Sequence, residues 1–223
     1  MMIEAYRDRY YDAVFDTDRA LALAVVDEAL AGGATPEQVV FEIVVPAIER
    51  MIKSFTEDFD ATLAQHFLAS QIAVEVTDAM LPRFARAPEI VGRVVIGTAR
   101  GDFHGLGKKI VSGCLKAKMI QVVDLGLNVE PARFVDEAVA QGASVIGISS
   151  MMIHTARGAD GPSGVRALLD ARGLSGRIKL VVGGAPYRFD PDLYKTVGAD
   201  GWAADGMAAA RVVADFIAAV KTA

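Results

Sequence analysis

The spacing of hydrophobic residues changes at about residue 84. Before it, apolar residues recur every three or four positions, which is typical of amphipathic helices. After it, short apolar runs alternate with helical patterns, as in a parallel sheet joined by helices. The chain is therefore predicted to contain a helical part followed by an α/β part.

The first part predicts four helices, which would pack as a four-helix bundle. They span about residues 3–14, 17–33, 35–55 and 60–81. Thr17, Thr35 and Asp60 are the candidate N-caps, because a side-chain oxygen at this position accepts a hydrogen bond from the first helical turn. Pro46 lies inside the third helix and predicts a kink, because it removes one backbone donor.

The stretch LPRFARAPEI separates the two parts. Pro82 and Pro88 bracket it and its composition turns basic, which predicts a linker. We therefore predict a helical cap domain over residues 1–84, a linker over 85–90 and a second domain over 91–223.

Five strand-helix repeats in the second part predict a five-stranded parallel sheet of the Rossmann-like (flavodoxin-like) class. The predicted strands span residues 92–99, 119–126, 143–150, 178–184 and 199–205, and the helices 105–118, 130–142, 163–172, 190–198 and 206–223. Ligands of such sheets bind at the carboxyl ends of the strands. The segments 97–107, 149–155 and 183–186 follow three of these strands and are expected to form one site.

Composition limits the possible environments and partners. The chain has 223 residues, 52% of them hydrophobic, and its net charge of −5 argues against nucleic-acid and anionic-membrane partners. A single cysteine, Cys114, cannot form an intramolecular disulfide and favours the cytoplasm. The amino terminus lacks the apolar core of a signal peptide, and no segment has the length of a membrane helix.

The glycine-rich turn GTARGDFHGLGKKIV carries a histidine, His104. It does not match a phosphate loop, because five residues separate Gly101 from Gly107 and Lys109 stands where Ser or Thr would bind magnesium. Its glycines also lack the spacing of a dinucleotide fingerprint. From the residues alone, His104 is either a hydrogen-bonded turn residue or the single protein ligand of a metal held by a macrocycle.

The motif Asp102-x-His104-x-x-Gly107 resembles the D-x-H-x-x-G signature of cobalamin-binding domains. Ser149-Ser150-Met151 is similar to the S-x-L motif of this family with Met for Leu, and Gly183-Gly184 to its G-G motif. Together these motifs resemble the cobalamin (corrinoid)-binding proteins of the methionine synthase and methyltransferase family.

The resemblance implies a base-off/His-on cobalamin. His104 would be the lower axial cobalt ligand, Asp102 would accept a hydrogen bond from it, and Thr155 would bind Asp102. The displaced nucleotide tail would lie between Ser149 and the glycine turn, where a Cβ would fill the slot. The implied cofactor contacts in this domain are Gly101, Asp102, Phe103, His104, Gly105, Gly107, Ser149, Met151, Ile153, Thr155, Gly183 and Gly184.

In the helical part, Phe59 and Leu63 are the closest candidates for the residues that cover the upper face of the corrin. They are expected one helical turn apart, and the F-L-P motif of relatives is missing. Ordinary core packing of a helix remains the alternative for both.

The implied protein is the non-catalytic corrinoid subunit of a cobalamin-dependent methyltransferase system. It would carry a methyl group between a methyl-donor and a methyl-acceptor methyltransferase, with a reductive activation protein as a further partner. Its cofactor would be methylcobalamin or another corrinoid. The alternatives are a cobalamin-sensing regulatory module and the small subunit of an adenosylcobalamin-dependent mutase.

Overall fold

The computed structural model describes residues 3–85 and 90–221. Its contacts divide the chain into two compact units, Met1–Glu89 and Ile90–Ala223, called here the helical unit and the sheet unit. The division falls inside the predicted linker 85–90, of which residues 86–89 lie outside the described residues.

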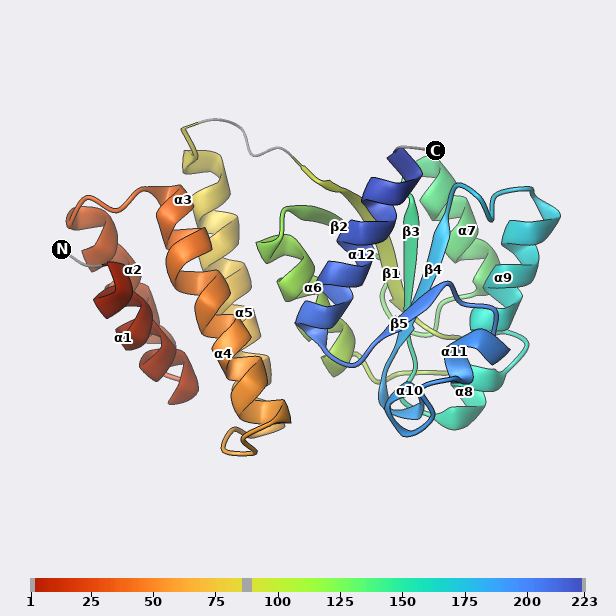
Figure 1. Cartoon of the computed structure of the whole chain (residues 1–223), viewed down its shortest axis with the longest axis horizontal. Helices are drawn as coiled ribbons and strands as arrows, with labels where there is room; N and C mark the ends of the chain where they lie inside the picture. Colours follow the sequence, from red (N-terminus) through yellow and green to blue (C-terminus); the bar gives the residue numbers. More distant parts are fainter. Residues whose placement is uncertain (1–2, 86–89, 222–223) are drawn as a thin grey trace. The chain divides into compact units, whose positions relative to one another are not determined.

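The helical unit contains the predicted four helical segments, the third of which is continuous through three elements (Figure 1). The elements are α1 (Ile3–Phe15), α2 (Arg19–Ala31), α3 (Pro36–Gln38), η1 (Val39–Val44), α4 (Val45–Thr56), α5 (Leu63–Met80) and the short η2 (Leu81–Arg83). Their apolar faces meet in a core that includes Tyr10, Val25, Ile43 and Met51, all fully buried. Among the described residues, no helix has the length and hydrophobicity needed to cross a bilayer.

The predicted caps are correct at one helix and wrong at two. Thr35 caps α3 in a reciprocal pair with Gln38, as predicted. Asp18, not Thr17, caps α2, because its carboxylate accepts a hydrogen bond from the Leu21 backbone at 2.9 Å. Thr17 instead has a left-handed backbone with φ of 59°, and α2 begins one residue later than the pattern suggested, at Arg19.

The cap of α5 is Thr62 and not Asp60. Thr62 Oγ1 accepts from the Gln65 backbone at 3.2 Å, and Gln65 Oε1 accepts from the Thr62 backbone at 2.9 Å. Both residues are polar and adjacent to the helix start, but only Thr62 has a partner at the third helical position that closes a capping box.

Replacing Thr62 by alanine is expected to lower the free energy of unfolding by about 1 kcal/mol, because the Gln65 backbone nitrogen loses its acceptor, Thr62 Oγ1. Asp60→Ala is the matched control and is expected to change it by less than about 0.5 kcal/mol. Urea unfolding followed by far-ultraviolet circular dichroism measures both. Equal losses would contradict the assignment of the cap.

Pro46 disturbs the third helical segment, as its position predicts, through a wider turn. The six residues of η1 form a π-helical stretch directly before α4, and the Val45 backbone donates to Val40 five residues earlier. The proline ring excludes the usual bond to the carbonyl four residues before it, and the wider turn gives the ring room.

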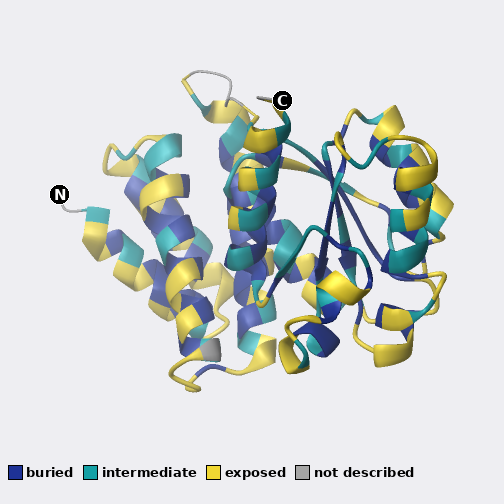
Figure 2. Cartoon of the chain, turned by 45° about the vertical axis from the view of Figure 1, so that its right-hand side comes forward, coloured by how far each residue is buried: buried dark blue, intermediate teal, exposed yellow. Residues whose placement is uncertain are grey.

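The sheet unit contains five parallel strands in the order β2-β1-β3-β4-β5, which confirms the predicted flavodoxin-like class. The strands are β1 (Gly92–Thr98), β2 (Ile120–Asp124), β3 (Val145–Ser149), β4 (Lys179–Gly183) and β5 (Gly201–Ala203). Figure 2 shows the central strands as mostly buried, which agrees with their runs of Val and Ile.

Helices cover both faces of this sheet (Figure 1). α6 (Leu106–Ala117) and α12 (Gly206–Lys221) lie on one face, and α7 (Pro131–Ala140) and α9 (Pro162–Ala171) on the other. Two short helices follow the carboxyl ends of β3 and β4, namely α8 (Ile153–Arg157) and α10 (Ala185–Phe189), and a third, α11 (Leu193–Thr196), lies between α10 and β5. α11 is the shortened form of the helix predicted over 190–198, and α8 and α10 were not predicted.

The strand register brings the predicted turns together. Thr98 at the end of β1 lies opposite Ser149 at the end of β3, and Ser149 lies opposite Gly183 at the end of β4. β1 has β2 on one side and β3 on the other, so the strand order reverses direction at β1. The turns after β1 and β3 therefore flank the topological switch point, where sheets of this class bind ligands.

Candidate functional site

Asp102 is the centre of the turn after β1. Its side chain is buried, and each of the two carboxylate oxygens accepts two hydrogen bonds. Oδ1 lies 2.9 Å from the backbone nitrogen of His104 and 3.0 Å from its Nδ1. Oδ2 lies 2.7 Å from the backbone nitrogen of Met151 and 2.9 Å from Thr155 Oγ1. One carboxylate thus joins the turn after β1 to the loop after β3 and to α8.

The same contacts set the charge of this carboxylate. Burial raises the pKa of Asp102, but the hydrogen bonds from His104, Met151 and Thr155 outweigh it and hold the pKa below its usual value. An ionised carboxylate only accepts hydrogen bonds, so the His104 Nδ1 must carry the proton that it donates. The lone pair of the imidazole then resides on Nε2.

The His104 imidazole has the properties of a metal ligand. Its side chain is 56% exposed, although its Nδ1 is held by a fully buried carboxylate. A carboxylate on the second ring nitrogen fixes the tautomer and raises the basicity of the first. Within residues 3–85 and 90–221, no group of three or more His, Cys, Asp or Glu side chains could hold a metal ion. A metal that brings its other ligands in a macrocycle fits this single imidazole.

Exposed apolar side chains lie in the histidine turn and in the segment after β3. Phe103 beside it is 67% exposed, and Met151 and Ile153 after β3 are each about half exposed. Further exposed members of this edge are Leu127, Met152 and Phe189. Side chains of this size are usually buried, and several at one edge of a sheet indicate a binding surface for a large apolar group.

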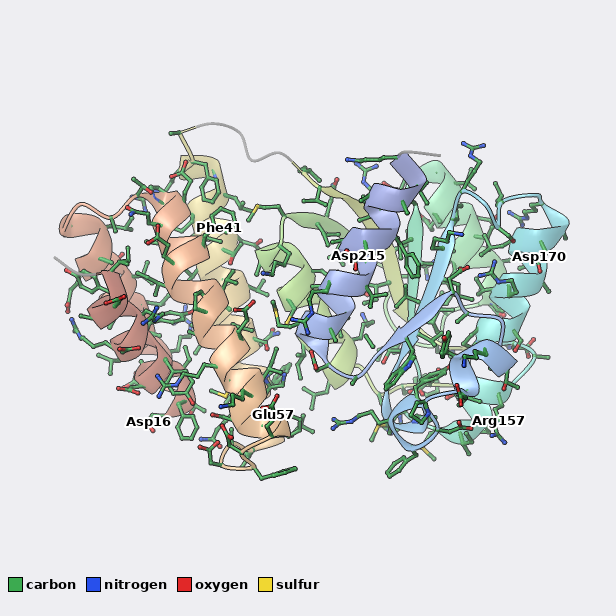
Figure 3. All side chains as sticks on the ribbon, viewed as in Figure 1. Asp16, Phe41, Glu57, Arg157, Asp170 and Asp215 are labelled. Carbon is green, nitrogen blue, oxygen red and sulfur yellow. The ribbon has the colours of Figure 1, made fainter. Side chains whose placement is uncertain are left out.

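An ion pair joins two of the elements at this edge. Arg157, the last residue of α8 and labelled in Figure 3, lies 3.5 Å from the Asp190 carboxylate just after α10. Both side chains are about half exposed, so the pair contributes little to stability. It links the helix that carries Thr155 to the turn that follows Gly184.

Gly183 ends β4 and Gly184 follows it, and the fold itself restricts side chains at this pair. Gly184 has φ of +113°, and a Cβ there would lie 2.0 Å from the carbonyl oxygen of Ser150. A Cβ at Gly183 would meet the Ala203 carbonyl oxygen at 3.3 Å. Gly184 therefore lets the turn after β4 approach the loop after β3 closely. A side chain at this position is excluded by the Ser150 carbonyl oxygen of the protein itself.

The three glycines of the histidine turn also differ from one another. Gly101 has a left-handed backbone with φ of +77°. Gly105 caps α6, and a Cβ there would lie 2.9 Å from Leu127 Cδ2. At Gly107 no described atom lies within 4 Å of the position of a Cβ, so nothing in the protein itself requires glycine there.

Phe59 and Leu63 lie in the helical unit, and the prediction that one helical turn separates them is wrong. Phe59 lies in the loop before α5 with a left-handed backbone, and Leu63 is the first residue of that helix. The helix begins later than predicted because Thr62 caps it. Both side chains are exposed, 82% for Phe59 and 46% for Leu63, so neither is a core residue.

Two further residues hold the histidine turn and were not predicted. Thr98 is fully buried, and its Oγ1 donates to the carbonyl oxygen of Asp102 at 2.6 Å. Asn128 Oδ1 accepts from the Gly101 backbone at 2.7 Å. The only signal in the sequence is the residue type of Asn128, since asparagine tolerates the left-handed backbone that it adopts here.

Lys108 was also not singled out. Its side chain is only 3% exposed although lysine rarely lies inside a protein, and its ammonium group pairs with the Asp124 carboxylate at the end of β2. The same carboxylate accepts from the Gly126 backbone at 2.8 Å. The pair ties the first turn of α6 to the loop after β2.

Comparison with known proteins identifies this architecture. Residues 92–211, more than half of the chain, match the family model of the B12 binding domain. The chain is 31% identical to trimethylamine corrinoid protein 1 of Methanosarcina mazei, over 85% of this chain and 86% of the relative. It is 32% identical to dimethylamine corrinoid protein 3 of Methanosarcina acetivorans, over 82% of this chain and 84% of the relative.

Solved structures agree on the fold. A cobalamin-binding protein from Desulfitobacterium hafniense superposes with a TM-score of 0.72 at 21% identity, covering 93% of this chain and 96% of that one. A methanol:cobalamin methyltransferase complex from Methanosarcina barkeri gives 0.74 at 19% identity, covering 96% of this chain and 80% of that one. The family resemblance and the corrinoid cofactor predicted from the motifs are confirmed: the chain belongs to the B12-binding domain family, and the group that it binds is a corrinoid.

Proposed function

We propose that this chain is a corrinoid carrier that binds cobalamin base-off/His-on and passes a methyl group between partner methyltransferases. The observation that supports it is the His104 imidazole, exposed toward solvent while its Nδ1 is hydrogen-bonded to the buried, ionised Asp102. That arrangement leaves the Nε2 lone pair available, and in this proposal Nε2 would hold the cobalt.

The residues around His104 fit a corrin. Phe103, Met151 and Ile153 offer exposed apolar surface, and a corrin ring has a broad apolar body. In this proposal Gly101, Gly105 and the Ser149 to Gly183-Gly184 edge contact the ring or its displaced nucleotide tail, and Phe59 and Leu63 contact the upper face. Gly107, where no described atom restricts a side chain, would face the cofactor and so explain its glycine.

A bound corrinoid supplies a cobalt ion that accepts and donates a methyl group. The protein holds and tunes the ligand. Asp102 keeps the Nδ1 proton in place and so keeps the Nε2 lone pair available. The same contacts would keep the Nδ1 proton in place whether or not Nε2 is bound to the metal. The Asp102 carboxylate, 3.0 Å from Nδ1, would stabilise an imidazole released from the metal, and the Thr155 hydroxyl holds that carboxylate in position.

The partners in this proposal are a methyl-donor and a methyl-acceptor methyltransferase, with a reductive activation protein as a third. The names of the relatives support it, because they are corrinoid proteins of trimethylamine and dimethylamine systems. A similar fold also occurs in a solved complex titled methanol:cobalamin methyltransferase.

The axial ligand is tested by replacing His104 with alanine. The variant reconstituted with cobalamin is expected to lose the absorption spectrum of imidazole-ligated cobalt and to retain bound corrinoid. His154→Ala is the matched control, because His154 is an exposed imidazole on α8 at the same sheet edge, and it should keep the wild-type spectrum. A wild-type spectrum in the His104 variant would refute the ligand assignment.

The carrier role is tested separately on the reduced holoprotein. Incubation with a trimethylamine methyltransferase and methyl-labelled trimethylamine is expected to leave label on the corrinoid protein. A second incubation with a methyl-acceptor methyltransferase should remove it. A sensory module would bind cobalamin without acquiring label from any methylamine or methanol donor system, and that result would overturn the carrier role.

A further inference from the structure

The loop after β2 holds the histidine turn at its main chain. Asn128 in this loop has a left-handed backbone with φ of 53°. This conformation lets its Oδ1 accept from the Gly101 backbone at 2.7 Å, across 27 positions of sequence. The side chain therefore reaches the residue directly before Asp102.

The main chain of Asn128 makes a second set of contacts with the turn. Its backbone nitrogen donates to Thr98 Oγ1 at 2.8 Å and lies 3.0 Å from the carbonyl oxygen of Asp102. Thr98 Oγ1 donates in turn to that same carbonyl oxygen at 2.6 Å. Thr98 and Asn128, called here the turn clamp, thus bind both Gly101 and Asp102.

The turn clamp acts on a flexible point. Gly101 has no Cβ and φ of +77°, so without a bonded partner its backbone has more accessible conformations than any other residue would have. The Asn128 amide removes that freedom on one side of Asp102. Met151 and Thr155 fix the carboxylate on the other side. His104, two residues further on, is then held by a backbone anchored at both ends.

We propose that Asn128 is a positioning residue for the axial ligand, and that its amide oxygen sets how strongly His104 is presented to the metal by fixing Gly101. This inference rests on the proposed function, because it concerns the His104–cobalt bond. A metal–imidazole bond weakens when the imidazole is displaced by a fraction of an ångström. The hydrogen bond at Gly101, three residues before His104, is therefore sufficient to change the strength of the His104–cobalt bond.

Two substitutions separate the amide from the backbone shape. Asn128→Gly keeps the left-handed conformation and removes the acceptor, and Asn128→Asp keeps both an acceptor and tolerance for that conformation. Asn128 is itself exposed, so the carboxylate of the aspartate variant stays solvated. The readout is the absorption spectrum of the cobalamin holoprotein during a titration with cyanide, which displaces the imidazole.

For Asn128→Gly, the cyanide concentration that displaces half of the imidazole is expected to fall about fivefold to tenfold, the factor that one lost hydrogen bond produces. Asn128→Asp should stay within about twofold of the wild type. Total cobalamin retained after gel filtration should be equal in all three proteins. An Asn128→Gly midpoint equal to that of the wild type would overturn the inference.

Thr98 provides a second test if Asn128→Gly folds poorly. Thr98→Ser keeps the hydroxyl and should leave the midpoint unchanged, whereas Thr98→Val removes it and should lower the midpoint in the same direction as Asn128→Gly. Equal midpoints for the serine and valine variants would count against the turn clamp. Failure of the proposed function is recognised independently, because His104→Ala would then keep the wild-type spectrum while the Asn128 variants bind cobalamin normally.

Discussion

Replacing Gly184 by alanine is expected to lower the free energy of unfolding of the sheet unit by at least about 3 kcal/mol and to abolish corrinoid binding. A Cβ at this position would lie 2.0 Å from the carbonyl oxygen of Ser150, and φ of +113° is a conformation that side chains disfavour. The obstructing atom belongs to the backbone, so a rotamer change cannot relieve the clash. The ends of β3 and β4 would have to separate, and these ends form part of the proposed corrinoid site.

Two other glycines serve as controls for this prediction. Gly142 also has a positive φ, +61°, but no described atom lies within 4 Å of its Cβ position, so Gly142→Ala should cost only about 1 kcal/mol. Gly107 lies in α6, and the space around its Cβ position is open. Gly107→Ala should therefore leave the free energy of unfolding unchanged or raise it by up to about 1 kcal/mol. Trp202 lies in β5 and is the single tryptophan of the chain. Its fluorescence therefore reports the urea unfolding of this unit. A Gly184 variant no less stable than the Gly142 variant would contradict the close approach.

Asp102→Asn is expected to lower the free energy of unfolding by about 2 to 4 kcal/mol and to weaken imidazole ligation. All four groups around this carboxylate are hydrogen-bond donors toward it: the two backbone nitrogens, His104 Nδ1 and Thr155 Oγ1. An asparagine amide presents one oxygen and one NH₂ group, so in either orientation a donor faces two donors inside the protein.

The pH dependence of the free energy of unfolding tests whether the ionised Asp102 carboxylate is the source of the stability that Asp102→Asn loses. The pKa of Asp102 is lower in the folded protein than in the unfolded chain, so its contribution to stability is fully present above about pH 4 and is lost as the pH falls through the folded pKa. The asparagine variant lacks this part of the acid destabilisation. Urea unfolding of the apoprotein between pH 7 and pH 3 should show a smaller loss of stability for the variant than for the wild type.

Asp215→Asn is the control for that experiment, because Asp215 lies on the exposed side of α12 (Figure 3). It should follow the wild-type pH dependence and change the stability at pH 7 by less than about 0.5 kcal/mol. The assignment to Asp102 fails if its asparagine variant loses as much stability in acid as the wild type.

The sequence predicts well those helices and strands that are long enough to show a complete repeat of hydrophobic and polar positions. The five strands fall within a residue or two of their apolar runs, and the long helices follow their apolar faces. α8 and α10 have only five residues each and carry no complete repeat. The starts of α2 and α5 were misplaced because several capping residue types stand side by side, and only the three-dimensional partner decides among them.

The site divides in the same way. Asp102 and His104 are found by their motif spacing and Thr155 by the family resemblance, and the structure brings the three side chains together. The roles of Thr98 and Asn128 depend on main-chain atoms of segments about thirty positions apart, which no local pattern records. Gly184 was located by its motif, but the reason for it is the backbone of Ser150.

The four hydrogen bonds on the Asp102 carboxylate come entirely from the protein chain. The imidazole is therefore preorganised in the apoprotein, and the entropy of ordering it is lost during folding and not on association. Association with the corrinoid should consequently show little of the heat-capacity change that accompanies coupled folding, beyond that from the apolar surface covered. Imidazole ligation and folding stability are therefore coupled at this carboxylate, so a substitution of Asp102 weakens both.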